Sequence, residues 1–375
     1  MYKIDFKKPI HVHFIGIGGI SMSGLAEILL EEGFTISGSD SKESPLTRKL
    51  ESEGAHIFYG QKAENITDGI ECVVYTAAIS RSNPELIEAV ARKIPMLTRA
   101  ELLGQLMKNY DTPIAVSGTH GKTTTTSMIS HILLAGNLDP TISVGGILKA
   151  IGGNIRVGSS GTFITEACEY TNSFLHFFPK ISVILNIEED HLDFFKDLED
   201  IRHSFRQFAE LLPDDGTLVI NGDIKNYEEI SRGLSCRVVT YGSSADFDYH
   251  AAGISYDDQG HVSFDMIRRN GSKDRISLSV TGDHNVSNAL SAIAVAELLN
   301  IPMDTIKEGL LSFTGTDRRF EYKGEFNGVT VVDDYAHHPT EICATLKAAK
   351  HQPHNCVWCV FQPHTYTRTK AFFHE

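Results

Sequence analysis

Short apolar runs that predict β-strands alternate with longer mixed segments that predict helices along the first part of the chain. The apolar runs lie at residues 10–15, 34–37 and 72–76, and an apolar helix is predicted from Leu25 to Leu30. Alternation of this kind is typical of a parallel sheet with helices on both faces. The sequence therefore predicts an α/β protein whose first domain, residues 1–98, is doubly wound.

A second series of elements follows over residues 99–313, which we predict to be a central domain. Its long helices are expected from Lys122 to about Leu134 and from Ala289 to Leu299. Strands are expected at residues 113–116, 162–165, 181–185, 218–221, 238–241 and 262–266. The α/β pattern thus continues in a larger unit.

The last part, residues 314–375, contains fewer elements. Residues 329–332 predict a strand, residues 340–350 a helix and residues 357–361 a second strand. Two strands are too few for an independent domain, and a parallel sheet must be covered on both faces. We therefore expect an incomplete third domain in a fragment of a longer protein, with an unpaired edge at the last strand and slow catalysis.

The strand at residues 113–116 leads into a glycine loop and then into a helix, which is the order of a phosphate-binding loop. Glycines let backbone N–H groups turn toward an anion, and the helix N-terminus adds partial positive charge. We expect Lys122 to reach the β- and γ-phosphates of ATP, and the Thr123 hydroxyl to bind Mg²⁺. The usual pattern has a glycine where this chain has Val116, so a simple glycine turn before a threonine-rich helix is the alternative. The predicted nucleotide site comprises Gly118, Thr119, His120, Gly121, Lys122, Thr123 and Thr124.

A second glycine turn, Gly16-Ile-Gly-Gly19, follows the first predicted strand, and Asp40 follows the second. This arrangement suggests a dinucleotide site. The third glycine of that fingerprint is replaced by Ser21, and the next glycine is Gly24. We therefore expect only that a pyrophosphate-bearing nucleotide binds at this helix start, and a purely structural turn is the alternative.

Carboxylates and one histidine follow predicted strand ends in the central region. Glu166 closes one strand, Glu169 lies close behind it, and His191 follows the next strand. A carboxylate at the carboxyl end of a strand beside a phosphate loop is well placed to hold a metal. We interpret Glu166 and His191 as metal ligands from neighbouring strand ends, and Glu188 and Glu189 as solvated.

Composition limits the class of partner. The net charge of −14 argues against a nucleic-acid or anionic-membrane surface. No apolar run approaches the roughly 18 residues of a membrane span, and residues 1–8 lack an apolar signal core. Cys356 and Cys359 have a redox spacing, but they lie in an apolar, strand-like run, so we expect buried structural thiols. Together these features predict a cytoplasmic enzyme.

Eight motifs, in order along the chain from His11 to its last residue, resemble those of the Mur ligase family. They are Gly16-Ile-Gly-Gly-Ile-Ser-Met-Ser-Gly24, Gly118-Thr-His-Gly-Lys-Thr-Thr124, Glu166-Ala-Cys-Glu169, residues 186–193, His284-Asn-Val-Ser-Asn288, Asp317-Arg-Arg-Phe320, Asp334-Tyr-Ala-His-His-Pro339, and Gln362-Pro-His364 with Arg368. The resemblance implies a three-domain architecture. A Rossmann-like UDP-sugar-binding domain (1–98) would precede a central P-loop ATPase domain (99–313) and an incomplete, truncated Rossmann-like C-terminal domain (314–375).

The resemblance also implies roles for individual residues. The implied substrate-binding residues are Gly18, Gly19, Ser21, Met22, Ser23, Asp40, Glu169 and His337. The implied contacts to ATP beyond the phosphate loop are Asn285, Asn288, Arg319 and Asp334, and the implied Mg²⁺ ligands are Thr123, Glu166 and His191. The implied catalytic residues are Lys122, Glu166, His191, Arg319, His364 and Arg368, the last two facing the amino acid and the muramyl carboxylate.

The implied activity is that of an ATP- and Mg²⁺-dependent ligase in peptidoglycan precursor synthesis. It would join L-alanine to UDP-N-acetylmuramate through an acyl phosphate, as a monomer or weak homodimer. Sister ligases carry a carbamylated lysine in the interval that here runs from Asp197 to Ile224, and no lysine occurs there, as in the alanine-adding branch. Two departures concern Gln61, where a histidine is common, and Thr365, where many members have an arginine whose role would pass to Arg368.

Four other functions remain open at this stage. A sister ligase that recycles peptidoglycan joins a whole tripeptide to the same UDP-sugar and has similar motifs. Folylpolyglutamate synthase shares the central domain but lacks the N-terminal glycine turn. A nicotinamide oxidoreductase would leave the phosphate loop unexplained, and a non-enzymatic nucleotide sensor would fit the incomplete third domain.

Overall fold

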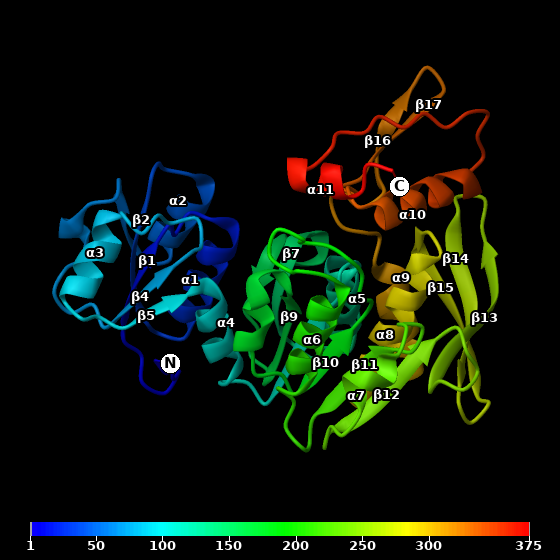
Figure 1. The fold of residues 1–375 in the computed structure, drawn as a ribbon, viewed down its shortest axis with the longest axis horizontal. Helices are drawn as coiled ribbons and strands as arrows, with labels where there is room; N and C mark the ends of the chain where they lie inside the picture. The colour runs from blue at the N-terminus through cyan, green and yellow to red at the C-terminus, as the bar shows by residue number, and fades with distance from the viewer. Residues whose placement is uncertain (1, 375) are drawn as a thin grey trace.

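The computed structural model describes residues 2–374 of the chain. Three parts follow one another, with the N-terminal part at one end, a large central sheet in the middle and a small C-terminal part above one side of that sheet (Figure 1). Among the described residues, no helix is long and apolar enough to cross a membrane.

The N-terminal part is a five-stranded parallel sheet in the order β3-β2-β1-β4-β5. Its strands are β1 (His11–Ile15), β2 (Thr35–Asp40), β3 (His56–Tyr59), β4 (Cys72–Tyr75) and β5 (Met96–Thr98). Its helices are α1 (Ile20–Glu31), α2 (Pro45–Ser52) and α3 (Pro84–Ala91). The strand order reverses at β1, so the predicted doubly wound fold is confirmed, and the first glycine turn lies at the switch point where such folds bind ligands.

The central part is a ten-stranded sheet in the order β15-β14-β13-β12-β11-β10-β6-β9-β7-β8. Its parallel strands are β6 (Thr112–Ser117), β7 (Thr141–Leu148), β9 (Thr162–Ala167), β10 (Ile181–Ile184), β11 (Thr217–Asn221), β12 (Arg237–Gly242) and β13 (Tyr249–Tyr256). The antiparallel additions are β8 (Gly153–Arg156), β14 (His261–Arg268) and β15 (Lys273–Thr281). Because β6 pairs with both β9 and β10, the ends of these three strands lie together.

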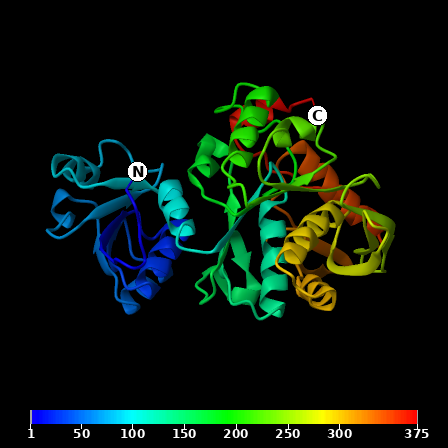
Figure 2. The same ribbon diagram turned by 90° about the horizontal axis from the view of Figure 1, so that it is seen from below.

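Helices cover both faces of the central sheet. They are α4 (Arg99–Met107), α5 (Lys122–Ala135), α6 (Leu198–Ala209), α7 (Tyr227–Ser231), α8 (His284–Leu298) and α9 (Met303–Ser312). Helices α5, α8 and α9 lie side by side on one face (Figure 2), where they share a buried core with β6, β10 and β14. Four alanines and no charged residue occupy positions 289–296 of α8, and this small apolar surface lets the helix pack closely.

The other face of the central sheet shares one apolar core with the N-terminal part. Leu102 and Leu106 of α4 belong to the cluster that holds Phe14 of β1 as well as Phe163 and Phe208 of the central part. Gly104 of α4 brings the two backbones so close that a Cβ there would lie 1.9 Å from the carbonyl oxygen of His176. Burial of each large apolar side chain stabilises the fold by about 1.5–3 kcal/mol, so this seam joins the two parts firmly.

The C-terminal part consists of an antiparallel hairpin and two helices. They are β16 (Glu321–Phe326), β17 (Val329–Asp333), α10 (Pro339–His351) and α11 (Tyr366–Ala371). The prediction of a strand at residues 357–361 is wrong, since this segment pairs with no strand, and Val360 is 99% exposed. The prediction of buried thiols is also wrong, because Cys356 and Cys359 lie in the same exposed segment. Apolar sequence alone does not make a strand without a partner for its backbone groups.

The contact between α1 and β8 gives a test of how the first two parts pack. A Cβ on Gly24 would lie 2.0 Å from Cγ1 of Ile155, so Gly24→Ala should lower the free energy of unfolding by about 1–3 kcal/mol through overpacking. Ile155→Ala removes the clashing atom. The double variant should therefore lose less unfolding free energy than the two single variants lose in total. Denaturant unfolding of the four proteins measures this coupling. Purely additive effects would show that the two surfaces are not in contact.

Candidate functional site

The phosphate loop connects β6 to α5 as predicted. Gly118 and Gly121 have φ angles of 149° and 83°, a region that favours glycine. A Cβ on Gly121 would also lie 2.7 Å from Oδ1 of Asn288, so the loop packs tightly against the start of α8. On the other side, the Asn186 side chain accepts a hydrogen bond from the backbone N–H of His120 and donates one to its carbonyl oxygen. The loop is therefore fixed from both sides.

Lys122 at the first turn of α5 points back into the loop. Its ammonium group donates hydrogen bonds to the carbonyl oxygens of Gly118 and Thr119 and lies 3.0 Å from Oε2 of Glu169. Burial lowers the pKa of Lys122, but the charges of Glu169 and its neighbours outweigh this effect and raise it above its ordinary value. The lysine is thus a buried cation, and Glu169, predicted to bind substrate, is its counter-ion.

The predicted metal ligands lie around the same loop. Burial raises the pKa of Glu166, and hydrogen bonds from the Gly145 N–H and the Thr123 hydroxyl partly offset this shift. A carboxylate whose pKa is raised by its surroundings fits a place where a cation would favour the charged form. With the Thr123 hydroxyl it offers the oxygen ligands that Mg²⁺ prefers.

His191 lies on the far side of β6 from Glu166. The expectation of neighbouring strands is wrong here, because β6 lies between β9 and β10. The His191 backbone has φ of 54°, its ring stacks on Tyr170 at 4.5 Å, and its Nε2 lies 3.8 Å from Oε1 of Glu169. Burial lowers the pKa of His191, so the ring is neutral and has a nitrogen lone pair for a metal.

A large cavity of about 560 Å³ opens beside the phosphate loop, within the size range of a ligand site. It brings together predicted nucleotide-binding residues from all sides: His120, Gly121, Thr123, Thr124, Asn285, Asn288, Arg319 and Asp334. Asn285 and Asn288 are buried and hydrogen-bonded to each other at 3.0 Å. Asp334 accepts hydrogen bonds from the backbone N–H groups of Phe320 and Ala336 and so fixes the loop around Arg319.

A second cavity of about 210 Å³ lies next to His191. Arg368 of α11 lines it and makes a charged pair with Asp190, with its Nη2 2.8 Å from Oδ1. Nδ1 of His364 lies 2.9 Å from Nη1 of Arg368, and the His337 ring lies 5.1 Å from that of His364. Four predicted residues, His191 among them, are therefore gathered at this cavity or beside it.

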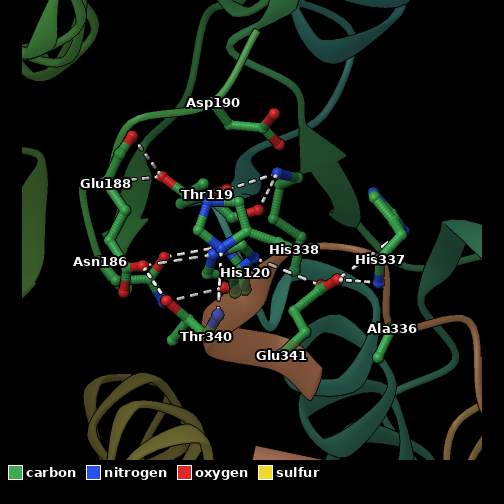
Figure 3. A network of polar contacts seen from close by, with 12 residues as sticks. Thr119, His120, Asn186, Glu188, Asp190, Ala336, His337, His338, Thr340 and Glu341 are labelled. Carbon is green, nitrogen blue, oxygen red and sulfur yellow. Dashed lines mark hydrogen bonds and ion pairs between the residues drawn. The ribbon is translucent and has the colours of Figure 1, made fainter. Parts of the chain in front are cut away.

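The sequence did not predict the contacts that join the third part to the phosphate loop. His120 lies between two carboxylates, with its Nδ1 3.3 Å from Glu341 and its Nε2 3.5 Å from Glu188 (Figure 3). Burial lowers the pKa of His120, but the two carboxylates raise it more, to about 9. The Thr340 hydroxyl donates to Glu188, whose side chain is 34% exposed, so the prediction that Glu188 is solvated holds only in part. Glu189 is exposed, as predicted.

Glu341 is the central carboxylate of this junction. It lies 3.5 Å from Nη1 of Arg319 and 3.7 Å from Nδ1 of His337 as well as against His120. Burial raises the pKa of Glu341, but these cations lower it well below its usual range. An acidic residue in the first turn of a helix is usual, so nothing in the local sequence distinguished Glu341 from an ordinary helix start.

The N-terminal glycine turn forms a separate candidate site. Oδ2 of Asp40 accepts a hydrogen bond from the Gly18 N–H at 2.9 Å. Gly19 and Ser21 are exposed at the start of α1. Met22 is 2% exposed and Ser23 is 5% exposed, so these two residues are buried at the start of α1 rather than displayed at its surface.

Comparison with known proteins places every part of the chain in one family. Residues 11–111 match the Mur ligase family catalytic domain, residues 116–296 the Mur ligase middle domain, and residues 318–375 the Mur ligase glutamate ligase domain. The UDP-N-acetylmuramate–L-alanine ligases of Agathobacter rectalis and Lachnospira eligens are 63% and 60% identical in sequence to this chain. Each alignment covers 100% of this chain and 82% of the relative.

Solved structures show the same similarity. The UDP-N-acetylmuramate–alanine ligase of Thermotoga maritima superposes with a TM-score of 0.76 at 30% identity, over 91% of this chain and 78% of that one. A murein peptide ligase of Psychrobacter arcticus superposes with a TM-score of 0.75 at 28% identity, over 91% and 76% of the two chains.

The His120 ion pairs predict a pH-dependent stability. Because the folded pKa is raised from 6.5 to about 9, the stabilisation from His120 is complete below pH 6.5 and is lost as pH rises to about 9. His120→Asn keeps the backbone bonds to Asn186 but removes the charge. The difference in unfolding free energy between wild type and this variant, from urea titrations, should therefore shrink over that pH range. Glu341→Gln should flatten the dependence, whereas a constant difference would contradict the assignment.

Proposed function

The chain belongs to the Mur ligase family, and we propose that it joins L-alanine to UDP-N-acetylmuramate while ATP is cleaved to ADP and phosphate. The similarity at 60–63% identity to ligases of that name, across the whole chain, supports this substrate pair. The observation that carries the proposal is the arrangement of the two cavities. Lys122 at the nucleotide loop and His191 at the second cavity both contact Glu169, so the two ligands would meet there.

ATP would occupy the larger cavity. Its phosphates would lie against the N-terminus of α5, where free N–H groups and the helix dipole attract anions. Lys122 would exchange its bond to Glu169 for one to the γ-phosphate, and Arg319 would approach from the third part. Asn285, Asn288 and Asp334 would hold the nucleoside end.

The residues around the loop fit Mg²⁺. Thr123 and Glu166 would hold it through oxygen, His191 would complete the set, and the remaining positions would be taken by water and phosphate. When bound, Mg²⁺ neutralises charge on the β- and γ-phosphates. The histidine is an unusual ligand for this ion, and its assignment rests on the family resemblance.

The chemistry requires activation of a carboxylate. The muramyl carboxylate oxygen attacks the γ-phosphorus, the bond to ADP breaks, and an acyl phosphate forms. The amine of alanine then attacks the acyl carbon, phosphate leaves with the bonding electrons, and the amine proton is lost. The protein contributes orientation and charge neutralisation. Loss of Lys122 or Arg319 should each remove about 3 kcal/mol of transition-state stabilisation.

The second cavity suits the reacting ends of the two substrates. Arg368 is planar and presents paired donors that match a carboxylate, and His364 and His337 lie beside it. A substrate carboxylate would compete with Asp190 for Arg368. The UDP end would lie far from this chemistry, on Gly18, Gly19 and the start of α1 with Asp40.

The remaining expectations belong to the same proposal. The domains would divide near residues 98 and 313. The protein would act in the cytoplasm as a monomer or weak homodimer, in the synthesis of peptidoglycan precursors.

A substrate panel tests the proposed function. With ATP and UDP-N-acetylmuramate, the intact protein should release phosphate when L-alanine is added but not when the stem tripeptide is added. Lys122→Ala should lower turnover by two orders of magnitude or more and leave UDP-N-acetylmuramate binding unchanged in calorimetry. Preference for the tripeptide would instead identify a recycling ligase. Equal loss of UDP-sugar affinity in the variant would refute the two separate sites.

The metal assignment has its own test. Glu166→Gln keeps the hydrogen bond from Gly145 but removes the charge, so it should raise the Mg²⁺ concentration needed for half-maximal activity at least tenfold. His191→Ala should raise it less, because one of several ligands is lost. Activity measured against Mg²⁺ at saturating ATP gives both values. An unchanged Mg²⁺ dependence in His191→Ala would make that histidine structural only.

A further inference from the structure

A second cluster of possible metal ligands lies outside the site proposed for Mg²⁺. It consists of His120 from the phosphate loop, Glu188 from the loop after β10, and His338, which directly precedes α10 (Figure 3). One ligand atom from each lies within 4.8 Å of the others. Over residues 2–374 it is the only group of at least three histidine, cysteine, aspartate or glutamate side chains gathered this closely.

The two nitrogens of His120 have different surroundings. Nδ1 lies 3.3 Å from Oε1 of Glu341. Nε2 is buried without a hydrogen-bond partner and lies 3.5 Å from Oε2 of Glu188. Metal-bound imidazoles in proteins show this division, with one nitrogen on the metal and the other on a carboxylate that orients the ring. Glu341 is placed to be that orienting carboxylate.

His338 supplies the second imidazole. It is 4% exposed, and its ring centre lies 4.6 Å from that of His120 at an interplanar angle of 49°. Its Nε2 is 3.0 Å from the carbonyl oxygen of Glu189, and its Nδ1 accepts a bond of 3.3 Å from the Thr340 N–H. Coordination would replace one of these two bonds and leave the other to orient the ring.

We propose that His120, Glu188 and His338 bind a divalent transition metal of the Zn²⁺ class and that the metal ties the C-terminal part to the phosphate loop. Two imidazoles and one carboxylate suit zinc, whereas Mg²⁺ prefers an all-oxygen set. The ligand atoms would have to approach to roughly 3.3 Å from one another, the separation that tetrahedral bonds of about 2.0–2.1 Å impose. That contraction would draw α10 toward the loop.

The site would have three protein ligands and one open position. His120 and Glu188 line the large cavity, so the open position faces the space proposed for ATP. The ion would displace the proton from Nε2 of His120 to solvent, and Glu188 and Glu341 would balance its charge. The inference rests on these contacts alone and does not depend on the proposed ligase activity.

Titration with Zn²⁺ tests the proposal directly. The intact protein, stripped of metal and then kept in excess Mg²⁺ to occupy the other site, should bind one Zn²⁺ in calorimetry. Glu188→Gln and His338→Ala should each weaken this binding at least tenfold. His337→Ala is the matched control, because His337 is adjacent in sequence but bonds to the Tyr335 carbonyl and faces Glu341 from the other side. The control should bind Zn²⁺ as wild type does.

Co²⁺ provides a second readout that does not require a variant. Bound to this site, Co²⁺ should give the intense visible absorption of a four-coordinate ion, and Zn²⁺ should abolish it by displacement. Wild-type protein without this absorption would overturn the proposal. Undiminished Zn²⁺ affinity in Glu188→Gln, which preserves the shape of the side chain, would also overturn it. So would Zn²⁺ binding that is lost in His191→Ala but retained in His338→Ala.

Discussion

The parallel pairing of β6 with β9 on one side and β10 on the other is the constraint on which the rest of the site depends. Parallel strands end at the same edge, so this pairing delivers the phosphate loop, Glu166 and the loop from Asn186 to His191 to one place. Charged side chains are therefore concentrated at this edge of the sheet. Each cation there is paired with a carboxylate: Lys122 with Glu169, and His120 with Glu188 and Glu341.

These pairs neutralise the charged groups of the loop within the chain itself. Unpaired buried charges are costly, and the Glu169 carboxylate next to Lys122 supplies the negative charge that a phosphate would bring. Nucleotide binding would then be an exchange of one anionic partner for another rather than the filling of an empty cationic site. The same reasoning would apply to Arg368, whose guanidinium is paired with Asp190 and would exchange that partner for a substrate carboxylate.

The strands and the phosphate loop were predictable because their signals are local. Apolar runs marked β6, β9 and β10, and the glycine spacing marked the turn before Lys122. Strand β13 was not predicted, because most of its residues are at least partly exposed and no apolar run reveals it. The order of the strands in the sheet, which places β6 between Glu166 and His191, also could not be predicted from local sequence patterns.

The ion-pair partners of the charged residues could not be predicted either, because they are distant in sequence. Glu341 and Glu188 contact His120 across separations of more than sixty positions in sequence, and only the assembled fold brings them together. At residues 357–361 the sequence predicted a strand that the structure does not contain. The composition of this segment suits a strand, but a strand also needs a neighbouring strand to pair with its backbone groups, and composition does not show whether one is present.

The two junctions of the molecule differ in chemistry, and that difference has a mechanical consequence. The seam around α4 is apolar and closely packed, so sliding or opening it would expose hydrocarbon to water, and the first two parts should turn as one rigid body. The C-terminal part meets the phosphate loop through Glu341 against His120, and it meets the loop after β10 through Thr340 against Glu188 and Arg368 against Asp190. Polar groups of this kind can exchange partners with water or ligands at little cost. A swinging motion of this chain is therefore expected on its C-terminal side, where mostly polar contacts and the stack of Tyr256 on His351 would have to be released.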